Sequence, residues 1–252
     1  MKITNEIPKN WKNLQNLVCK YLNESGYKAE SPKTIELVRG DVEVDVYATA
    51  ENELIKMFIC ECKCWNTKVP KEKVHAFKTV VEQSGATVGI LISKSGFQKG
   101  AVDAAFQSNI LLKDWNGFIE MISNQWIYHK LIKIKHLIQP LSVYIDPLDV
   151  AVDFENKEFK KKYFQIQKKC FHEYMLGSSL NCELLNKKSI HIGSKEFYFC
   201  NELFDYLEKV YNVSVTEFAM LIPYVENHKF EVGGYTLMSM MEDYYNGNFG
   251  LS

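Results

Sequence analysis

Apolar residues near the start of the chain recur at the spacing of an amphipathic helix. Within residues 10–25 the apolar positions fall on one helical face: Leu14, Leu17, Val18, Tyr21 and Leu22. Gly26 follows where a C-cap glycine is expected. This pattern predicts a helix over 10–25, and the more extended pattern after it predicts a first strand over 34–39.

Two further segments have the pattern of neighbouring strands. Over 42–48 three valines alternate with three polar or aromatic residues: Val42, Val44 and Val46 against Glu43, Asp45 and Tyr47. The segment 54–64, LIKMFICECKC, is more uniformly apolar, as expected of a central strand buried on both faces. The connection between them is short, so we expect an antiparallel pair.

Strands and helices alternate after residue 64, which favours a mixed α/β sheet flanked by helices. We expect helices over 71–83, 98–108 and 116–138, and strands over 86–93 and 110–115. Pro140 and Pro147 flank a plausible domain boundary. Beyond it the sequence predicts a smaller α+β domain with helices over 155–176, 201–211 and 214–227 and a hairpin around Gly193 and Ser194. The predicted domains are therefore 1–139 and 140–252.

Composition is that of a globular protein without a membrane segment. No apolar run reaches the ~18 residues that a membrane helix needs, and the first residues lack the apolar core of a secretory signal. Seven cysteines without regular spacing fit reduced thiols. We therefore expect a cytoplasmic protein with no membrane partner.

The net charge of −1 conceals an asymmetry between the two halves of the chain. Residues 1–139 hold 19 basic against 15 acidic residues, and the remainder holds 11 against 16. The first half is therefore the better candidate for contact with a polyanion, and the acidic second half is a poor candidate for the main DNA-binding surface. Chance variation of surface charge is the alternative explanation.

Alternation along the two central strands brings three charged residues to one face. Glu61 and Lys63 share a face of their strand, opposite Cys60, Cys62 and Cys64, and antiparallel pairing places Asp45 beside them. Two neighbouring carboxylates suit a hard cation such as Mg²⁺. A lysine beside such a cation can orient water or stabilise charge on a phosphate. The pattern thus indicates phosphodiester hydrolysis.

Two simpler explanations compete with a catalytic site. Asp45, Glu61 and Lys63 are also consistent with a cross-strand salt bridge on a solvated face, although charged residues inside a buried strand are costly unless paired. The three alternating cysteines invite a zinc site, but successive same-face positions lie ~6.6 Å apart and converge poorly on one ion. We therefore interpret the cysteines as core thiols.

The segments GDVEVDVYA, FICECKCW, VPKEKVHAF and GATVGILISKSGFQKGAVDAAFQSNILLKDW together resemble the Mrr-type restriction endonuclease family. That family belongs to the PD-(D/E)xK nuclease superfamily, and the resemblance covers about residues 11–120. It implies a restriction-endonuclease-like fold and an Mg²⁺-dependent endonuclease acting on DNA, with Mn²⁺ able to substitute. It further implies Asp45, Glu61 and the Cys62 backbone carbonyl as metal ligands and Lys63 as the catalytic lysine.

Two further positions follow from the same resemblance. Members often carry a glutamate on the first helix that assists the metal site, and here the matching residue is Gln15. Gln15 can order water or phosphate but is a weaker Mg²⁺ ligand, and it is equally consistent with a surface helix position. Gln98 and Lys99 begin the helix after the GFQKGA loop, where free backbone N–H groups can bind a phosphate.

Three functions remain open from the sequence. The first is a DNA endonuclease of restriction or phage defence, whose second domain recognises its target or forms a homodimer and which acts alone or with a helper protein. The second is a catalytically weak module that binds nucleic acid or a partner, which Gln15 favours. The third is a nuclease for RNA or branched DNA with the same catalytic residues.

Overall fold

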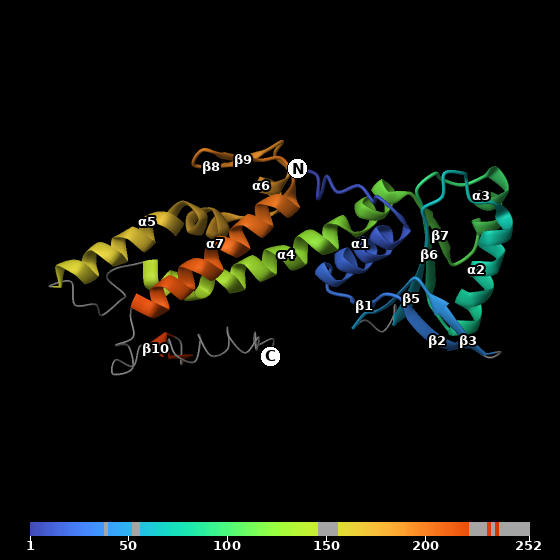
Figure 1. The fold of residues 1–252 in the computed structure, drawn as a ribbon, viewed down its shortest axis with the longest axis horizontal. Coiled ribbons are helices and arrows are strands. Elements are labelled where there is room, and N and C mark those ends of the chain that lie inside the picture. The colour runs from blue at the N-terminus through green and yellow to red at the C-terminus, as the bar shows by residue number, and fades with distance from the viewer. Residues whose placement is uncertain (38–39, 52–55, 146–155, 222–230, 233–234, 237–252) are drawn as a thin grey trace. The chain divides into compact units, whose positions relative to one another are not determined.

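A computed structural model describes residues 1–37, 40–51, 56–145, 156–221, 231–232 and 235–236. It divides into two compact units (Figure 1). The first unit comprises Asn5–His129, and the second comprises Met1–Thr4 together with Lys130–Ser252. The boundary predicted at 139/140 lies inside a long helix, and the chain passes from the first unit to the second between His129 and Lys130.

The first unit is a mixed sheet flanked by helices, which confirms the predicted fold class. Its elements, in chain order, are α1 (Trp11–Glu24), β1 (Lys28–Glu30), β2 (Lys33–Leu37), β3 (Gly40–Val44), β4 (Val46–Thr49), β5 (Met57–Lys63), α2 (Lys71–Ser84), β6 (Val88–Ser93), α3 (Lys99–Ala105), β7 (Ile110–Lys113) and the start of α4 (Trp115–Ile145). Among the described residues the main sheet has five strands in the order β1-β4-β5-β6-β7.

Strand directions follow the lengths of the connections. The β4–β5 pair is antiparallel, as predicted from its short connection. The pairs β5–β6 and β6–β7 are parallel, and each is joined by a helical crossover, α2 and then α3. Figure 1 shows the sheet between α1 on one side and α2 with α3 on the other. The carboxyl end of β5 is therefore followed by the loop that leads into α2.

Packing against the sheet explains the regular spacing of apolar residues within α1 and α2. The buried face of α1 is the one predicted, and Tyr21 on it contacts the rings of Trp115 and Trp126. On the other side, Phe77 and Val81 of α2 lie so close to Gly89 of β6 that a Cβ atom would clash there. Glycine at this position lets the helix approach the sheet closely.

The predicted strand over 42–48 is not continuous, and this corrects the sequence interpretation. The chain bends at Asp45. The preceding strand β3 forms a separate antiparallel hairpin with β2, whereas β4 belongs to the main sheet. The bend lies where the chain changes its pairing partner: Val44 pairs with Lys33 in the hairpin, and Val46 pairs with Cys60 in the main sheet. The short strand β1 was not predicted.

The second unit contains helices and a hairpin. Its elements are the rest of α4, α5 (Lys157–Ser179), α6 (Cys182–Leu185), β8 (Ile190–Ile192), β9 (Lys195–Phe197), α7 (Cys200–Leu221), β10 (Glu231–Val232) and β11 (Tyr235–Thr236). The hairpin β8–β9 turns at Gly193 and Ser194, as predicted. The short helix α6 was not predicted, and the predicted helical residues 222–227 lie outside the described ranges.

Two helices continue beyond their predicted ends, because buried apolar residues lie on both sides of the positions where a break was expected. Helix α4 passes through Pro140, whose neighbours Ile138 and Leu141 are buried. Helix α7 joins the two predicted helices 201–211 and 214–227 into one, with Tyr211 and Val215 buried on either side of the expected break. An apolar face that continues across an unfavourable residue offsets the local cost.

Candidate active site

Asp45 lies at the bend between β3 and β4, at the end of the β4–β5 ladder. The last paired residues of that ladder are Val46 and Cys60. Beyond them no backbone of β4 faces β5, and the side chain of Asp45 occupies this position instead. Its Oδ2 accepts a hydrogen bond from the backbone N–H of Cys62 at 2.6 Å. Because of the strand break, the Asp45 carboxylate replaces a backbone carbonyl as the hydrogen-bond acceptor for this part of β5.

Gln15 reaches the same carboxylate from helix α1. Its Nε2 donates to Oδ1 of Asp45, and its Oε1 accepts from Lys12 at 3.4 Å. The Gln15 side chain is buried, at 4% exposed, so the interpretation of Gln15 as a surface residue is wrong. Each oxygen of Asp45 therefore has one hydrogen-bond donor from the protein and keeps a further lone pair.

Glu61 and Lys63 project from the same face of β5, as alternation along a strand requires. Their side chains form a salt bridge and are 24% and 19% exposed. Burial and the negative charge of Asp45 raise the pKa of Glu61, and Lys63 and Lys73 oppose that rise. A cation bound by both carboxylates would offset their mutual repulsion.

Cys62 stands between these residues with its thiol in the core and its backbone at the site. Burial raises the pKa of the thiol well above its usual range. Since the N–H of Cys62 points at Asp45, its carbonyl points to the same edge of the strand. The next carbonyl, that of Lys63, points the other way and accepts from the N–H of Lys94 at 3.0 Å. A carbonyl and two carboxylates therefore share one edge.

Comparison with known proteins identifies the family of this part of the chain. Residues 9–122 match the model of the Mrr-type restriction endonuclease catalytic domain. These residues form a restriction endonuclease domain of the Mrr type.

No curated protein matches the chain. A crystal structure of a protein of unknown function, AF1548, is similar at 16% identity and a TM-score of 0.40, over 81% of this chain and 100% of that one. That likeness is too low to carry an argument. The family match over residues 9–122 is what shows that the chain contains a restriction endonuclease domain.

Within the Mrr-type domain, five of the predicted residues come together and two lie elsewhere. Hydrogen bonds join Asp45 to Gln15 and to the backbone of Cys62, and Glu61, which the charge of Asp45 influences, pairs with Lys63. In contrast, Gln98 and Lys99 lie exposed at the start of α3. The Gln98 backbone N–H donates to the carbonyl of Val69 at 3.0 Å, which links this loop to the one that follows β5. No contact with the two carboxylates joins them among the described residues.

Two residues near the site were not predicted. Lys73 of α2 is close enough to lower the pKa of Glu61. Trp65 is partly exposed, and its ring centroid lies 5.6 Å from the Lys63 ammonium group. Trp65 is two residues after the lysine of the ExK motif, so its nearness could be inferred from the sequence. Lys73 was not, because only the packing of α2 against the sheet brings it to β5.

The donor set of the Mrr-type domain fits a hard divalent cation. Asp45 and Glu61 are both partly buried and near each other, and a backbone carbonyl faces the same edge. Mg²⁺ is held in proteins by one or two carboxylates with further oxygen ligands. Within the described ranges no three His, Cys, Asp or Glu side chains gather as a metal cluster, and a two-carboxylate site does not reach that number.

The thiols of the ExK strand belong to the core. Cys60 and Cys62 are buried, whereas Cys64 lies beyond the strand and is partly exposed. No described helix combines the length and apolar character needed to cross a membrane.

Proposed function

We propose that the Mrr-type domain hydrolyses phosphodiester bonds of DNA with Mg²⁺ as cofactor, and that it acts in restriction or phage defence. One observation carries the proposal: Asp45 is fixed to the backbone of Cys62, between Glu61 and Lys63 in sequence. This juxtaposition of two carboxylates, a carbonyl and an ammonium group is suited to phosphate chemistry at a cation. We expect Mn²⁺ to substitute because it prefers the same oxygen ligands.

Asp45, Glu61 and the Cys62 carbonyl would hold the cation. When bound, a divalent cation offsets the negative charge that develops on the phosphate. Gln15 fixes the orientation of Asp45 by donating to Oδ1. Because Gln15 is neutral, it adds no third charge to the donor set, which favours a site for a single cation.

Lys63 supplies the positive charge next to the cation ligands. Its ammonium group is held between the Glu61 carboxylate and the Trp65 ring, so it is oriented before substrate arrives. In this position it can orient an attacking water or stabilise charge on the phosphate. Gln98 and Lys99, both exposed, are proposed to bind a phosphate of the substrate at a distance from the cut.

The test is cleavage of supercoiled plasmid, methylated and unmethylated, with Mg²⁺ and with EDTA. We expect cutting with Mg²⁺ only, and a loss of at least ~100-fold in Lys63→Ala. The matched control is Lys28→Ala, which removes an exposed lysine of the same unit, paired with Glu51. It should cut like the wild-type protein. Equal activity of wild type and Lys63→Ala would refute the assignment of Lys63.

Other outcomes separate the alternatives. Mg²⁺ binding without plasmid cleavage would direct the search to RNA, branched DNA or a helper protein. Absence of both Mg²⁺ binding and cleavage would leave a module that binds nucleic acid or a partner. Cutting both strands of a duplex takes two active sites, so a homodimer is part of the proposal, and light scattering of the full chain on DNA measures it.

A further inference from the structure

The positive charge of the acidic second half is concentrated in one helix. Between residues 157 and 169, within α5, there are six lysines and a single acidic residue, Glu158. All other positions of 140–252 together hold five lysines against fifteen acidic residues. Although this half of the chain is acidic overall, the segment 157–169 of α5 is therefore strongly basic.

The two faces of α5 differ sharply in burial. The buried residues recur at intervals of three and four: Tyr163, Ile166, Cys170, Glu173 and Gly177. On the opposite face a second series recurs with the same spacing and is exposed: Lys157, Lys161, Phe164, Lys168, Phe171 and Met175. We call this series the outward stripe. A helix whose solvent face is half apolar and half basic has a surface suited to a ligand.

The lysines of the outward stripe form no close ion pair with a residue of the described ranges. Lys157, Lys161 and Lys168 form no salt bridge with a described residue. The lysines on the flank of the helix do: Lys162 lies 3.0 Å from Glu158, and Lys169 lies 2.8 Å from Glu217. Within the described part of the second unit, the ammonium groups of the stripe are therefore not held in salt bridges, and the nearest acidic influence is Glu158, whose pKa is lowered by Lys162 and, to a smaller extent, by Lys161.

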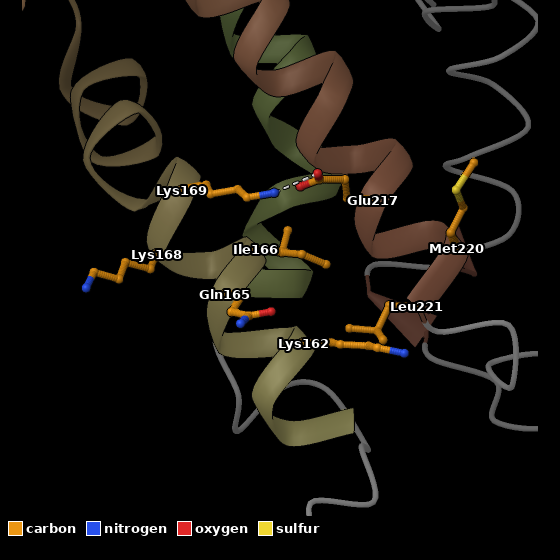
Figure 2. A pocket seen from close by; sticks show the side chains of 8 residues that line it. All are labelled: Lys162, Gln165, Ile166, Lys168, Lys169, Glu217, Met220 and Leu221. Carbon is orange, nitrogen blue, oxygen red and sulfur yellow. Dashed lines mark hydrogen bonds and ion pairs between the residues drawn. The ribbon is translucent and has the colours of Figure 1, made fainter. Parts of the chain in front are cut away.

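A cavity lies beside α5, and one of the paired lysines of the helix lines it. It has a volume of about 760 Å³ and is lined by residues of α5 and α7. Figure 2 shows Lys169 reaching across to Glu217, while Lys168 points away from the cavity. The cavity wall includes the Lys169–Glu217 ion pair, and Lys168, which is also among the lining residues, is the residue at which the outward stripe adjoins the cavity.

We propose that the outward stripe of α5 is a docking surface for the phosphate backbone of DNA, through which the second unit holds the substrate of the nuclease domain. The choice of DNA as the polyanion rests on the proposed function. From Lys157 to Lys168 the helix rises about 17 Å, a length over which duplex DNA carries about ten phosphates. Phe164, between Lys161 and Lys168, and Phe171, one turn beyond Lys168, offer apolar contact to sugars or thymine methyl groups.

A second copy of this chain fits the stripe less well. Lysine is depleted at protein interfaces. The stripe has no carboxylate, so a symmetric partner would bury three ammonium groups without an opposite charge. Unpaired buried charge is strongly destabilising. DNA supplies the missing charge and also releases its counterions on binding.

The experiment measures DNA affinity of the full chain as a function of salt, in a Lys63→Ala background that does not cut. Three lysines of the stripe are neutralised together: Lys157→Gln, Lys161→Gln and Lys168→Gln. The matched control neutralises three other exposed lysines of the second unit: Lys187→Gln, Lys188→Gln and Lys209→Gln. The probe is a duplex of mixed sequence, followed by fluorescence anisotropy.

We expect the stripe variant to bind at least ~10-fold more weakly, and its plot of log affinity against log salt to be shallower by about 3, or about 1 per lysine. The control should keep the parent slope. An unchanged slope in the stripe variant, or an equal change in the control, overturns the proposal. A parent dimer that becomes a monomer in the stripe variant, with no change in DNA affinity, also overturns it in favour of a copy interface.

The two proposals fail separately. If the wild-type protein does not cut plasmid but the stripe variant loses DNA affinity as expected, the nuclease assignment is wrong and the docking surface is supported. If the wild-type protein cuts and the stripe variant binds like its parent, the docking surface is wrong and the nuclease assignment is unaffected.

Discussion

Replacing Gln15 with glutamate changes one atom of the side chain that holds Asp45. In the wild-type protein Nε2 of Gln15 donates to Asp45 Oδ1, and the side chain is buried. Gln15→Glu replaces this N–H donor with an oxygen. The hydrogen bond to Asp45 is lost, and two carboxylates then lie side by side and repel each other. The substitution also introduces the residue type that the family often has at this position, which would give a cation a third carboxylate.

The size of the effect follows from the lost hydrogen bond. A hydrogen bond to a charged group contributes about 1.5–3 kcal/mol. We therefore expect Gln15→Glu to lower the free energy of unfolding in EDTA by about 2 kcal/mol or more, and to lower Tm by roughly 4–8 °C for a chain of this size. Saturating Mg²⁺ should reverse the loss. Each tenfold gain in Mg²⁺ affinity adds about 1.4 kcal/mol of stability at a fixed high concentration.

The assay is thermal unfolding of the wild-type protein, Gln15→Glu and Gln15→Leu, each in EDTA and in Mg²⁺. Gln15→Leu loses the same hydrogen bond without adding a carboxylate, so it should unfold early in both conditions. Only Gln15→Glu should show a larger Mg²⁺ shift than the wild-type protein. If Gln15→Glu is as stable as wild type in EDTA, Gln15 does not hold an ionised Asp45. If its Mg²⁺ shift equals that of wild type, the cation does not reach residue 15.

The remaining predictions concern the pKa of Glu61 and the packing of α2. Burial and Asp45 raise that pKa in the metal-free protein. Glu61 therefore contributes stability below the ordinary glutamate pKa of about 4.3, and the contribution is lost as pH rises through the raised pKa. Chemical denaturation across this range should show a smaller loss with rising pH in Glu61→Gln, and parallel pH profiles would contradict the reasoning. Mg²⁺ affinity should rise over the same pH range in calorimetric titrations, because the cation binds the ionised carboxylate. Lys73→Gln removes a charge that lowers this pKa and should move both profiles to higher pH; unmoved profiles would place Lys73 too far from Glu61 to matter. Gly89→Val should lower the free energy of unfolding in urea by about 1–3 kcal/mol, since a Cβ there would lie 2.8 Å from Phe77. An unchanged free energy of unfolding would mean that α2 does not pack closely against β6 at this position.

Local patterns in the sequence were sufficient where one element decides the outcome. The helix over 10–25, the antiparallel pairing of β4 with β5 and the turn at Gly193 each depend on residues close together in the chain. The shared face of Glu61 and Lys63 has the same origin, because side chains two apart in a strand project to the same side. The fold class followed from the alternation of strands and helices.

Long-range packing decided what local patterns could not. The bend at Asp45 lies where the chain leaves one sheet for another, because Val44 pairs with β2 and Val46 pairs with β5, and local alternation does not reveal these long-range partners. Nothing in the spacing of Gln15 shows that it lies over a carboxylate thirty residues away. Likewise, Pro140 lies in an unbroken helix because apolar neighbours on both sides remain buried.

The sequence by itself determined which residue types the protein has for phosphate chemistry and which faces of β5 they occupy. Only the tertiary structure decided what supports them: the amide of Gln15, the nearby charge of Lys73 and the edge that the Cys62 carbonyl faces. The physical reason is that periodicity fixes the direction of a side chain relative to its own element. Which element lies opposite depends on burying apolar surface over the whole chain.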